Sequence, residues 1–243
     1  MIKTGVCGFA KPQSVIFTNL PLLEVQTTFY RPMLKSTAEK WRMRTPKDFE
    51  FSLKAWQLIT HEPTSPTYRK AKMKIDANEM GRYGFFRPTD KVFEAWEVTN
   101  EIRKALDAEI VVFQCPASFK EKEENINNMG DFFRSIAVDR RDTKIIWEQR
   151  GGWNKNTIRK ICEELDLIHC VDPFADEPVT PAGFAYFRLH GSPPGKRMYR
   201  YTYTENDLKK LYEKCMHFSQ VYVLFNNDTM YEDALRFMKM VSS

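Results

Sequence analysis

The sequence contains no apolar run approaching the roughly 18 residues that a membrane-spanning helix requires. Its N-terminus, Met1-Ile2-Lys3, leads directly into a strand-like segment and does not resemble a signal peptide. The five cysteines are odd in number and form no Cys-x-x-Cys pair, which argues against a disulfide framework and against a zinc ribbon. We therefore expect a cytoplasmic protein that does not associate with membranes.

Two nucleotide-binding signatures are also missing. No glycine-rich turn follows the first strand-like segment, and a dinucleotide-binding sheet requires one. The stretch 191–196, Gly-Ser-Pro-Pro-Gly-Lys, superficially resembles a P-loop, but it is too short and Arg197 stands where Ser or Thr is required. The net charge of +5 is too small by itself to indicate a nucleic-acid-binding protein.

The segment 184–190, Phe-Ala-Tyr-Phe-Arg-Leu-His, has the composition of a buried strand between proline- and glycine-rich boundaries. Alternation places Tyr186, Arg188 and His190 on one face of this strand. Charged groups at the end of a buried strand are costly unless they are paired. Two interpretations follow: a buried structural ion pair, or a functional site at the mouth of a parallel sheet.

Strand-like and helix-like segments alternate along most of the chain. We expect strands at 2–7, within 20–29, and at 49–55, 109–114, 144–148, 167–171, 184–190 and 221–225, and helices at 36–44, 91–106, 120–137, 155–165, 204–217 and 231–241. Ser36 with Glu39, and Thr204 with Asp207, resemble helix caps. Such alternation over about 250 residues predicts a (β/α)₈ TIM barrel, here a single domain spanning 1–243 with a long basic insertion after the third strand. A doubly wound open sheet is the alternative.

Nearly every expected strand ends in a polar side chain, and the catalytic groups of such barrels lie at the C-terminal strand ends. The polar ends are Glu24, Gln26, Lys54, Gln114, Glu148, Arg150, Asp172, Arg188, His190, Asn226 and Asn227. We expect them to converge around one barrel mouth. The structural alternative is a salt-bridge network that closes the top of the barrel.

Six of these stretches carry a resemblance to a known family. They are Glu24-Val-Gln-Thr-Thr-Phe-Tyr30, Phe51-Ser-Leu-Lys54 with Ile59-Thr-His61, Phe113-Gln-Cys-Pro-Ala-Ser-Phe119, Trp147-Glu-Gln-Arg150, Tyr186-Phe-Arg-Leu-His-Gly191 and Phe225-Asn-Asn227. In this order they resemble the YecE-like family, the domain of unknown function numbered 72, over essentially the whole chain. The resemblance implies a TIM barrel and a strand-end site, but no particular reaction.

A carboxylate and a histidine in one pocket can serve as base and acid near neutral pH, so we predict Glu148 as general base and His190 as acid or proton relay. Lys54 and Arg188 are predicted to bind an anion, and Gln114 and Asn226 to orient the ligand. The other candidate ligand-binding residues are Glu24, His61, Arg150 and Asn227. We expect neither a metal nor a cofactor, because the interleaved cations repel a metal. The predicted function is an acid–base enzyme acting on a small phosphorylated or carboxylated ligand.

A different class of function rests on the basic segment 68–91, which holds seven Lys and Arg residues, three acids, and the aromatic residues Tyr68, Tyr83, Phe85 and Phe86. The segment 196–203 repeats this combination. Basic residues among aromatics suit single-stranded nucleic acid. The alternative function is therefore a nucleic-acid-binding protein or a metal-assisted phosphodiester hydrolase. The segment is otherwise a solvated loop with packed aromatics, or a lid over the site.

Overall fold

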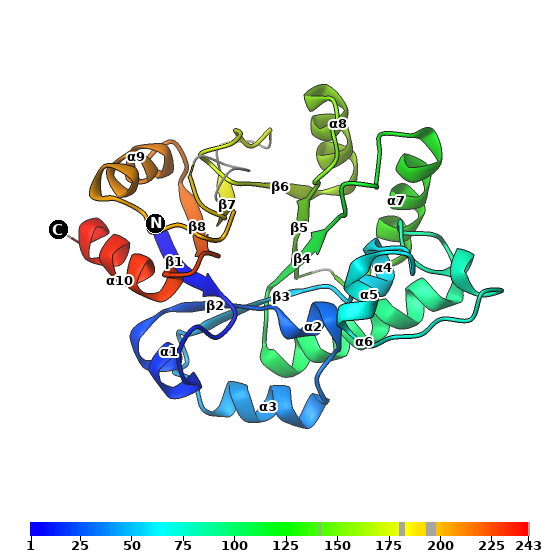
Figure 1. The fold of residues 1–243 in the computed structure, drawn as a ribbon, viewed down its shortest axis with the longest axis horizontal. Coiled ribbons are helices and arrows are strands. Elements are labelled where there is room, and N and C mark those ends of the chain that lie inside the picture. The colour runs from blue at the N-terminus through cyan, green and yellow to red at the C-terminus, as the bar shows by residue number, and fades with distance from the viewer. Residues whose placement is uncertain (141, 180–182, 193–197, 243) are drawn as a thin grey trace. The chain divides into compact units, whose positions relative to one another are not determined.

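The computed structural model describes residues 1–140, 142–179, 183–192 and 198–242, and Figure 1 labels its elements. The strands are β1 (Ile2–Cys7), β2 (Leu22–Val25), β3 (Glu50–Lys54), β4 (Ile110–Gln114), β5 (Lys144–Glu148), β6 (Leu167–Val171), β7 (Phe184–Leu189) and β8 (Gln220–Phe225). The helices are α1 (Gln13–Asn19), α2 (Thr27–Tyr30), α3 (Lys35–Met43), α4 (Gln57–Thr60), α5 (Pro66–Lys70), η1 (Met80–Arg82), α6 (Asp90–Leu106), α7 (Glu123–Ser135), α8 (Lys155–Leu165), α9 (Glu205–Cys215) and α10 (Met230–Val241).

The strands are parallel and follow one another in the closed order β1-β2-β3-β4-β5-β6-β7-β8. Parallel pairing requires a crossover after each strand, and most of the crossovers here contain helices. This order confirms the predicted fold class, an eight-stranded α/β barrel of the TIM type. That residues 1–243 form a single domain stays a prediction.

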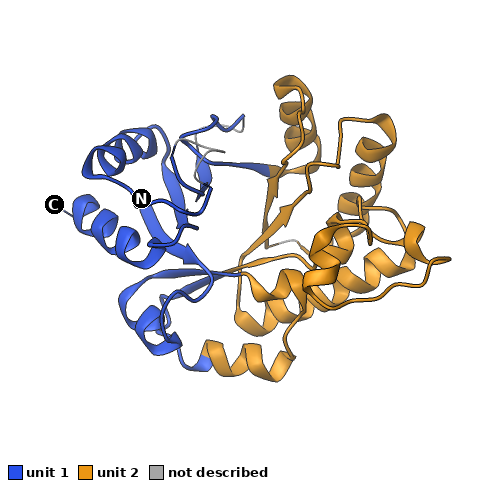
Figure 2. Cartoon of the chain, viewed as in Figure 1, with its two compact units in different colours: residues 1–25, 43–51, 168–243 blue, residues 26–42, 52–167 orange. Residues whose placement is uncertain are grey.

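The chain divides into two compact units, which Figure 2 colours separately. Unit 1 comprises Met1–Val25, Met43–Phe51 and Ile168–Ser243, and unit 2 comprises Gln26–Arg42 and Ser52–Leu167. The division falls within β3 and at the start of β6.

Unit 1 is built on the neighbouring strands β7, β8, β1 and β2, with α10 packed against β1 and β8. Gly5 lies so close to β2 that a Cβ atom there would come within 2.3 Å of the Leu22 carbonyl oxygen. The rings of Phe17, Phe49 and Phe51 pack edge to face with centroids 4.9–5.9 Å apart. Close backbone approach and aromatic packing together fix the strands of this unit.

Unit 2 has an aromatic core between β4, α7 and the connection that follows β3. Phe86 of that connection is completely buried, and its ring lies 5.3–5.9 Å from the rings of Phe113, Phe119, Phe132 and Phe133. Burying a phenylalanine contributes on the order of 2 kcal/mol. The connection is thus anchored on the core of unit 2 rather than suspended in solvent.

One detail of the sequence prediction is made more precise and another is wrong. The strand expected within 20–29 is β2, which ends at Val25, and α2 follows at Thr27, where the Thr28 hydroxyl donates to the Lys54 carbonyl oxygen at 2.7 Å. Ser36 is not a helix cap, because α3 already begins at Lys35. The second predicted cap is confirmed, since the Thr204 hydroxyl accepts from the Asp207 backbone N–H.

The five cysteines are free and buried. In the described part of the chain, no helix is both long and apolar enough to cross a membrane.

Candidate functional site at the strand ends

In unit 2, a buried lysine marks the end of β3. Lys54 is only 5% exposed, and its Nζ donates to Gln114 Oε1, at the end of β4, at 2.8 Å. The same ammonium lies 4.0 Å from the ring centroid of Phe29, a distance at which a cation–π interaction is favourable. The hydrogen bond and the aromatic face hold the charge of Lys54 at the strand ends.

The end of β5 adds a carboxylate and a guanidinium. Gln114 and Glu148 are direct partners in the parallel register of β4 and β5, so their side chains follow neighbouring strands at the same level. Glu148 is buried and accepts a hydrogen bond from Nε of the half-buried Arg150 at 3.0 Å. The pair leaves Arg150 accessible to solvent on one side.

His61 follows α4 and is held from three directions. The Thr60 hydroxyl lies 2.8 Å from its Nδ1, and the Tyr68 hydroxyl donates to its backbone carbonyl at 2.9 Å. Gly84, at a φ of +76°, packs so closely that a Cβ atom would come within 2.5 Å of the His61 backbone. Only glycine tolerates both this backbone conformation and this approach.

Burial lowers the pKa of His61 from 6.5 to about 3, with the charges of Lys54 and Arg150 acting in the same direction and Glu148 opposing them. Desolvation disfavours the imidazolium form, and nearby cations disfavour it further. His61 is therefore a neutral imidazole at physiological pH. Lys54, Arg150 and Glu148 together leave this cluster with one net positive charge, which suits an anionic ligand.

Unit 1 contains a completely buried ion pair between β2 and β7. The Arg188 and Glu24 side chains are 1% and 0% exposed, with Nη2 to Oε1 at 3.0 Å and Nε to Oε2 at 3.1 Å. The Tyr186 hydroxyl donates to the same carboxylate at 2.8 Å. Sequence analysis left two interpretations of the β7 segment, a buried ion pair and a functional site. For Arg188 the structure shows the buried ion pair.

The histidine that follows β7 faces an aspartate that follows β6. His190 Nδ1 lies 3.5 Å from Asp172 Oδ2, and the His190 backbone N–H donates to the same oxygen at 2.9 Å. The ring of Tyr199 lies edge-on to the His190 ring, with centroids 5.7 Å apart. The aspartate thus fixes both the backbone and the ring of His190.

The two asparagines after β8 differ in their environment. Asn226 is half-buried, and its backbone N–H donates to the Leu189 carbonyl at 2.9 Å. Asn227 is buried, and its amide donates to Asp233 of α10 and to the Tyr201 carbonyl, both at 2.7 Å. The contacts of Asn227 connect β8 to α10 and to the preceding loop.

The structure groups the predicted site residues by unit. It brings Lys54, Gln114, His61, Glu148 and Arg150 to the strand ends of unit 2, and it places Glu24, Arg188, His190, Asn226 and Asn227 in unit 1. Sequence reasoning missed Phe29, whose aromatic character carries no signal of its contact with Lys54. It counted Asp172 as a strand end but assigned it no role beside His190. No group of three or more His, Cys, Asp or Glu within the described ranges is placed to hold a metal.

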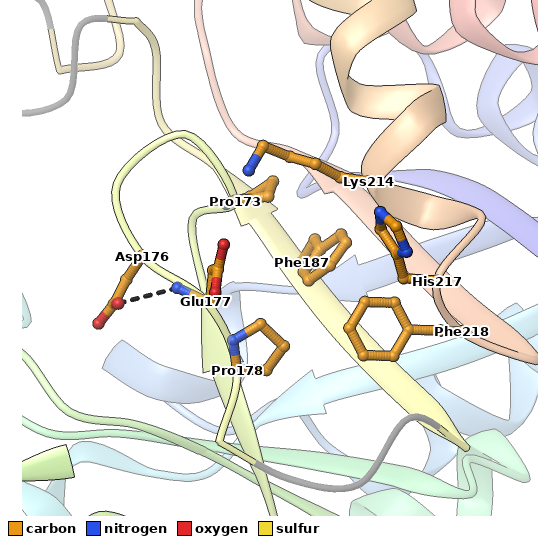
Figure 3. Close-up of a pocket in the computed structure, with 8 residues that line it drawn as sticks. All are labelled: Pro173, Asp176, Glu177, Pro178, Phe187, Lys214, His217 and Phe218. Carbon is orange, nitrogen blue, oxygen red and sulfur yellow. Dashed lines mark hydrogen bonds between the residues drawn. The ribbon is translucent and has the colours of Figure 1, made fainter.

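Unit 1 also has a cavity of about 320 Å³ (Figure 3). Its floor is formed by Phe187 and Phe218, whose ring centroids are 5.7 Å apart, and its walls carry Glu177 on one side and Lys214 and His217 on the other. It contains none of the predicted site residues.

The basic connection of unit 2 is partly compensated by acids. Arg82 pairs with Glu79 and Asp90, Arg87 with Glu62, and Lys91 with Glu94. Tyr68, Tyr83 and Phe86 are buried, so their faces are not available to stack on bases. Of the second predicted nucleic-acid segment, residues 196 and 197 lie outside the described residues. Nucleic-acid binding stays a prediction.

The closed order of parallel strands defines a barrel of the TIM class. The model of the family described as "Protein of unknown function DUF72" matches residues 16–243, and the chain belongs to this family. It is 24% identical to the UPF0759 protein YunF of Bacillus subtilis (strain 168), over 87% of this chain and 79% of that protein. The crystal structure of the DUF72 family protein EF0366 from Enterococcus faecalis V583 superposes with a TM-score of 0.70 and 21% identity, covering 100% of this chain and 98% of that one.

The same fold occurs in a protein with an assigned activity. The crystal structure of a D-psicose 3-epimerase in the presence of D-fructose matches with a TM-score of 0.59 and 10% identity, covering 98% of this chain and 97% of that one. At this identity the likeness concerns the fold alone.

We predict that Glu24→Gln lowers the free energy of unfolding by about 3–5 kcal/mol, because it leaves the buried Arg188 charge without a counter-ion. Urea unfolding followed by circular dichroism measures this loss. Glu232→Gln, which removes one partner of the exposed Lys11–Glu232 pair, is the matched control and should cost less than about 1 kcal/mol. The double variant Glu24→Gln/Arg188→Met should recover part of the loss. A cost for Glu24→Gln no larger than that of the control would contradict a structural role for the pair.

The neutral state of His61 predicts a pH dependence of stability. The unfolded chain binds a proton at His61 near pH 6.5 and the folded chain only near pH 3, so this contribution is complete above pH 6.5. It is lost as the pH falls from 6.5 towards 3, with a slope of up to about 1.4 kcal/mol per pH unit. Urea unfolding at pH 4 to 8 should show a shallower slope in His61→Gln than in the wild type. Equal slopes would mean that His61 titrates normally.

Proposed function

We propose that the protein is an acid–base enzyme that acts on a small phosphorylated or carboxylated ligand at the C-terminal ends of β3, β4 and β5. The observation that carries this proposal is the cluster in unit 2, where Lys54 and Arg150 accompany the buried carboxylate of Glu148 beside a neutral His61. Structural networks also bury charges, but the formal charge of +1 over Lys54, Arg150 and Glu148 and the partial exposure of Arg150 favour a ligand.

Each side chain has a proposed role. Lys54 and Arg150 bind the anion, and Gln114, fixed by its hydrogen bond to Lys54, orients the ligand. The anion-binding role that the sequence suggested for Arg188 passes to Arg150, because the Arg188 guanidinium is engaged with Glu24 in the buried pair. Arg150 supplies the same planar donor group and keeps access to solvent.

Glu148 is the proposed general base. Its carboxylate is buried yet held in orientation by Arg150, and a positioned carboxylate can remove a proton from a bound substrate. His190 belongs to unit 1, where Asp172 orients it, so its role as acid or proton relay stays a separate prediction and is not part of this proposed site. The fold shared with a D-psicose 3-epimerase makes sugar phosphates and sugar acids suitable first probes.

Anion binding at the cluster should be visible at His61. An anion between Lys54 and Arg150 counters the charges that lower the His61 pKa, so its ring signals should shift saturably in NMR titrations with glucose 6-phosphate or gluconate. Lys54→Gln should weaken this binding at least tenfold. Lys144→Gln removes an equal charge at the start of β5 and is the matched control, which should retain affinity. Unmoved signals, or equal losses in both variants, would refute the site.

Catalysis is tested by proton exchange. Incubation with a panel of sugar phosphates and sugar acids in D₂O should produce deuterium uptake or a new species, detected by NMR, for at least one compound. Glu148→Gln keeps an acceptor for Arg150 but removes the base, so the rate should fall by about 100-fold or more. Glu109→Gln, just before β4, is the control and should keep the wild-type rate. Turnover that persists in Glu148→Gln would remove Glu148 from the mechanism.

A further inference from the structure

A second concave surface in unit 2 is not part of the strand-end cluster. Residues 63–74, between α4 and η1, surround a pocket of about 480 Å³. The polar residues that line it are Thr64, Ser65, Tyr68 and the cations Arg69, Lys72 and Lys74. No acidic side chain lines it. The volume lies within the range of small-molecule sites.

The local backbone explains why three cations border one pocket. Ser65 caps α5 and Pro66 occupies its first turn. At the other end, Lys72 N–H bonds to the Arg69 carbonyl and Met73 N–H to the Tyr68 carbonyl, which is the Schellman pattern. This closure turns the chain back at Lys72 and keeps the residues that follow beside α5.

Lys72 occupies a position where glycine would be expected. Its φ is 53°, in the left-handed region, and the residue at this point of a Schellman closure is usually glycine. A lysine in this conformation raises the free energy of the folded chain by about 1 kcal/mol relative to glycine. The Lys72 side chain forms no ion pair with any described residue that would offset this cost. Folding therefore does not explain why a positive charge stands at this position.

Six of the seven cations in 68–91 fall into two groups, and the seventh, Lys70, donates to the Tyr30 hydroxyl at 3.2 Å. Arg82, Arg87 and Lys91 each have a carboxylate oxygen within 2.9 Å of a side-chain nitrogen. Arg69, Lys72 and Lys74 are exposed and form no ion pair with any residue that the structure describes. Like charges around one concavity repel each other, and an anion with two or more charges relieves that repulsion. Apart from Lys70, the cations of the connection without a carboxylate partner are thus those that line the pocket.

We propose that the pocket at 63–74 is a binding site for phosphate groups, in which Arg69, Lys72 and Lys74 neutralise the charge and the hydroxyl groups of Thr64 and Ser65 contribute hydrogen bonds. Phosphate fits better than a carboxylate because it carries about two charges and more acceptor oxygens. The phosphate comes from a small phosphorylated molecule or from the backbone of a single-stranded nucleic acid. Tyr68, Tyr83 and Phe86 are buried and cannot stack on bases, and the half-buried Phe85 does not line the pocket, so recognition there depends on phosphate rather than on bases.

The pocket also has a direct link to the strand-end cluster. Tyr68 lines the pocket, and its hydroxyl donates to the backbone carbonyl of His61 at 2.9 Å. The phosphate site nevertheless rests on its own residues and does not depend on the proposed enzymatic function.

The test measures the affinities for inorganic pyrophosphate, by calorimetry, and for fluorescein-labelled dT12, by anisotropy. Arg69→Gln/Lys72→Gln/Lys74→Gln should weaken the binding of whichever probe the wild type binds at least tenfold. Arg82→Gln/Arg87→Gln/Lys91→Gln removes the same net charge from the paired half of the connection and should change affinity less than twofold. All titrations are repeated with the Lys54→Gln variant, in which the strand-end site is disabled. Binding that persists in this variant belongs to the pocket, so the test of the pocket does not depend on the strand-end site.

Binding of pyrophosphate alone supports the site and identifies a small phosphorylated ligand. Binding of dT12 supports the site and identifies a nucleic-acid backbone. In that case the slope of log affinity against log salt concentration should fall in magnitude by about 2 in the first triple variant. Lys72→Gly relieves the left-handed strain, so its melting temperature should not fall although its affinity does. Binding of neither probe by the wild type, or equal losses in the two triple variants, would overturn the proposal.

Discussion

The buried ion pair between Glu24 and Arg188 sets the strictest constraint on unit 1. Its partners belong to β2 and β7, which are separated in the sheet by β1 and β8, so the pair connects four strands. Two charges without access to water are costly unless they are well hydrogen-bonded, and the Tyr186 hydroxyl donates a further hydrogen bond to the carboxylate. Any arrangement of β2 and β7 that separated these groups would leave an unpaired buried charge. The pair therefore selects one register of the strands, whatever its net contribution to stability.

The charged side chains at the strand ends of unit 2 are held by different contacts. Lys54 contacts an amide and an aromatic ring, which orient its ammonium. Glu148 accepts a hydrogen bond from Arg150, and burial keeps His61 neutral. The two cations and one carboxylate of this cluster carry a formal charge of +1, whereas Glu24 and Arg188 balance each other.

The sequence predicted the regular elements far better than the short ones. The strands at 2–7, 144–148 and 167–171 and the helix at 155–165 have the predicted bounds, because each combines a clear apolar period with flanking polar residues. The four-residue helices α2 and α4 escaped prediction, since one helical turn shows no period. Apolar character alone could not divide 20–29 into β2 and α2, because the division depends on the distant hydrogen bond from Thr28 to Lys54.

The candidate site shows where sequence reasoning stops. Strand position identified Glu24, Lys54, Glu148 and Arg188 as polar strand ends, but it could not say which cation meets which carboxylate, since pairing depends on strand neighbours and side-chain reach. The basic connection presents the same problem: its composition treats Arg69 and Arg87 alike, whereas folding gives Arg87 a carboxylate in Glu62 and leaves Arg69 beside a pocket. Cations that pair with a carboxylate in the folded protein and cations that remain available to a ligand are the same residue types. Only the contacts separate them, and net charge is therefore a poor guide to the partner of this protein.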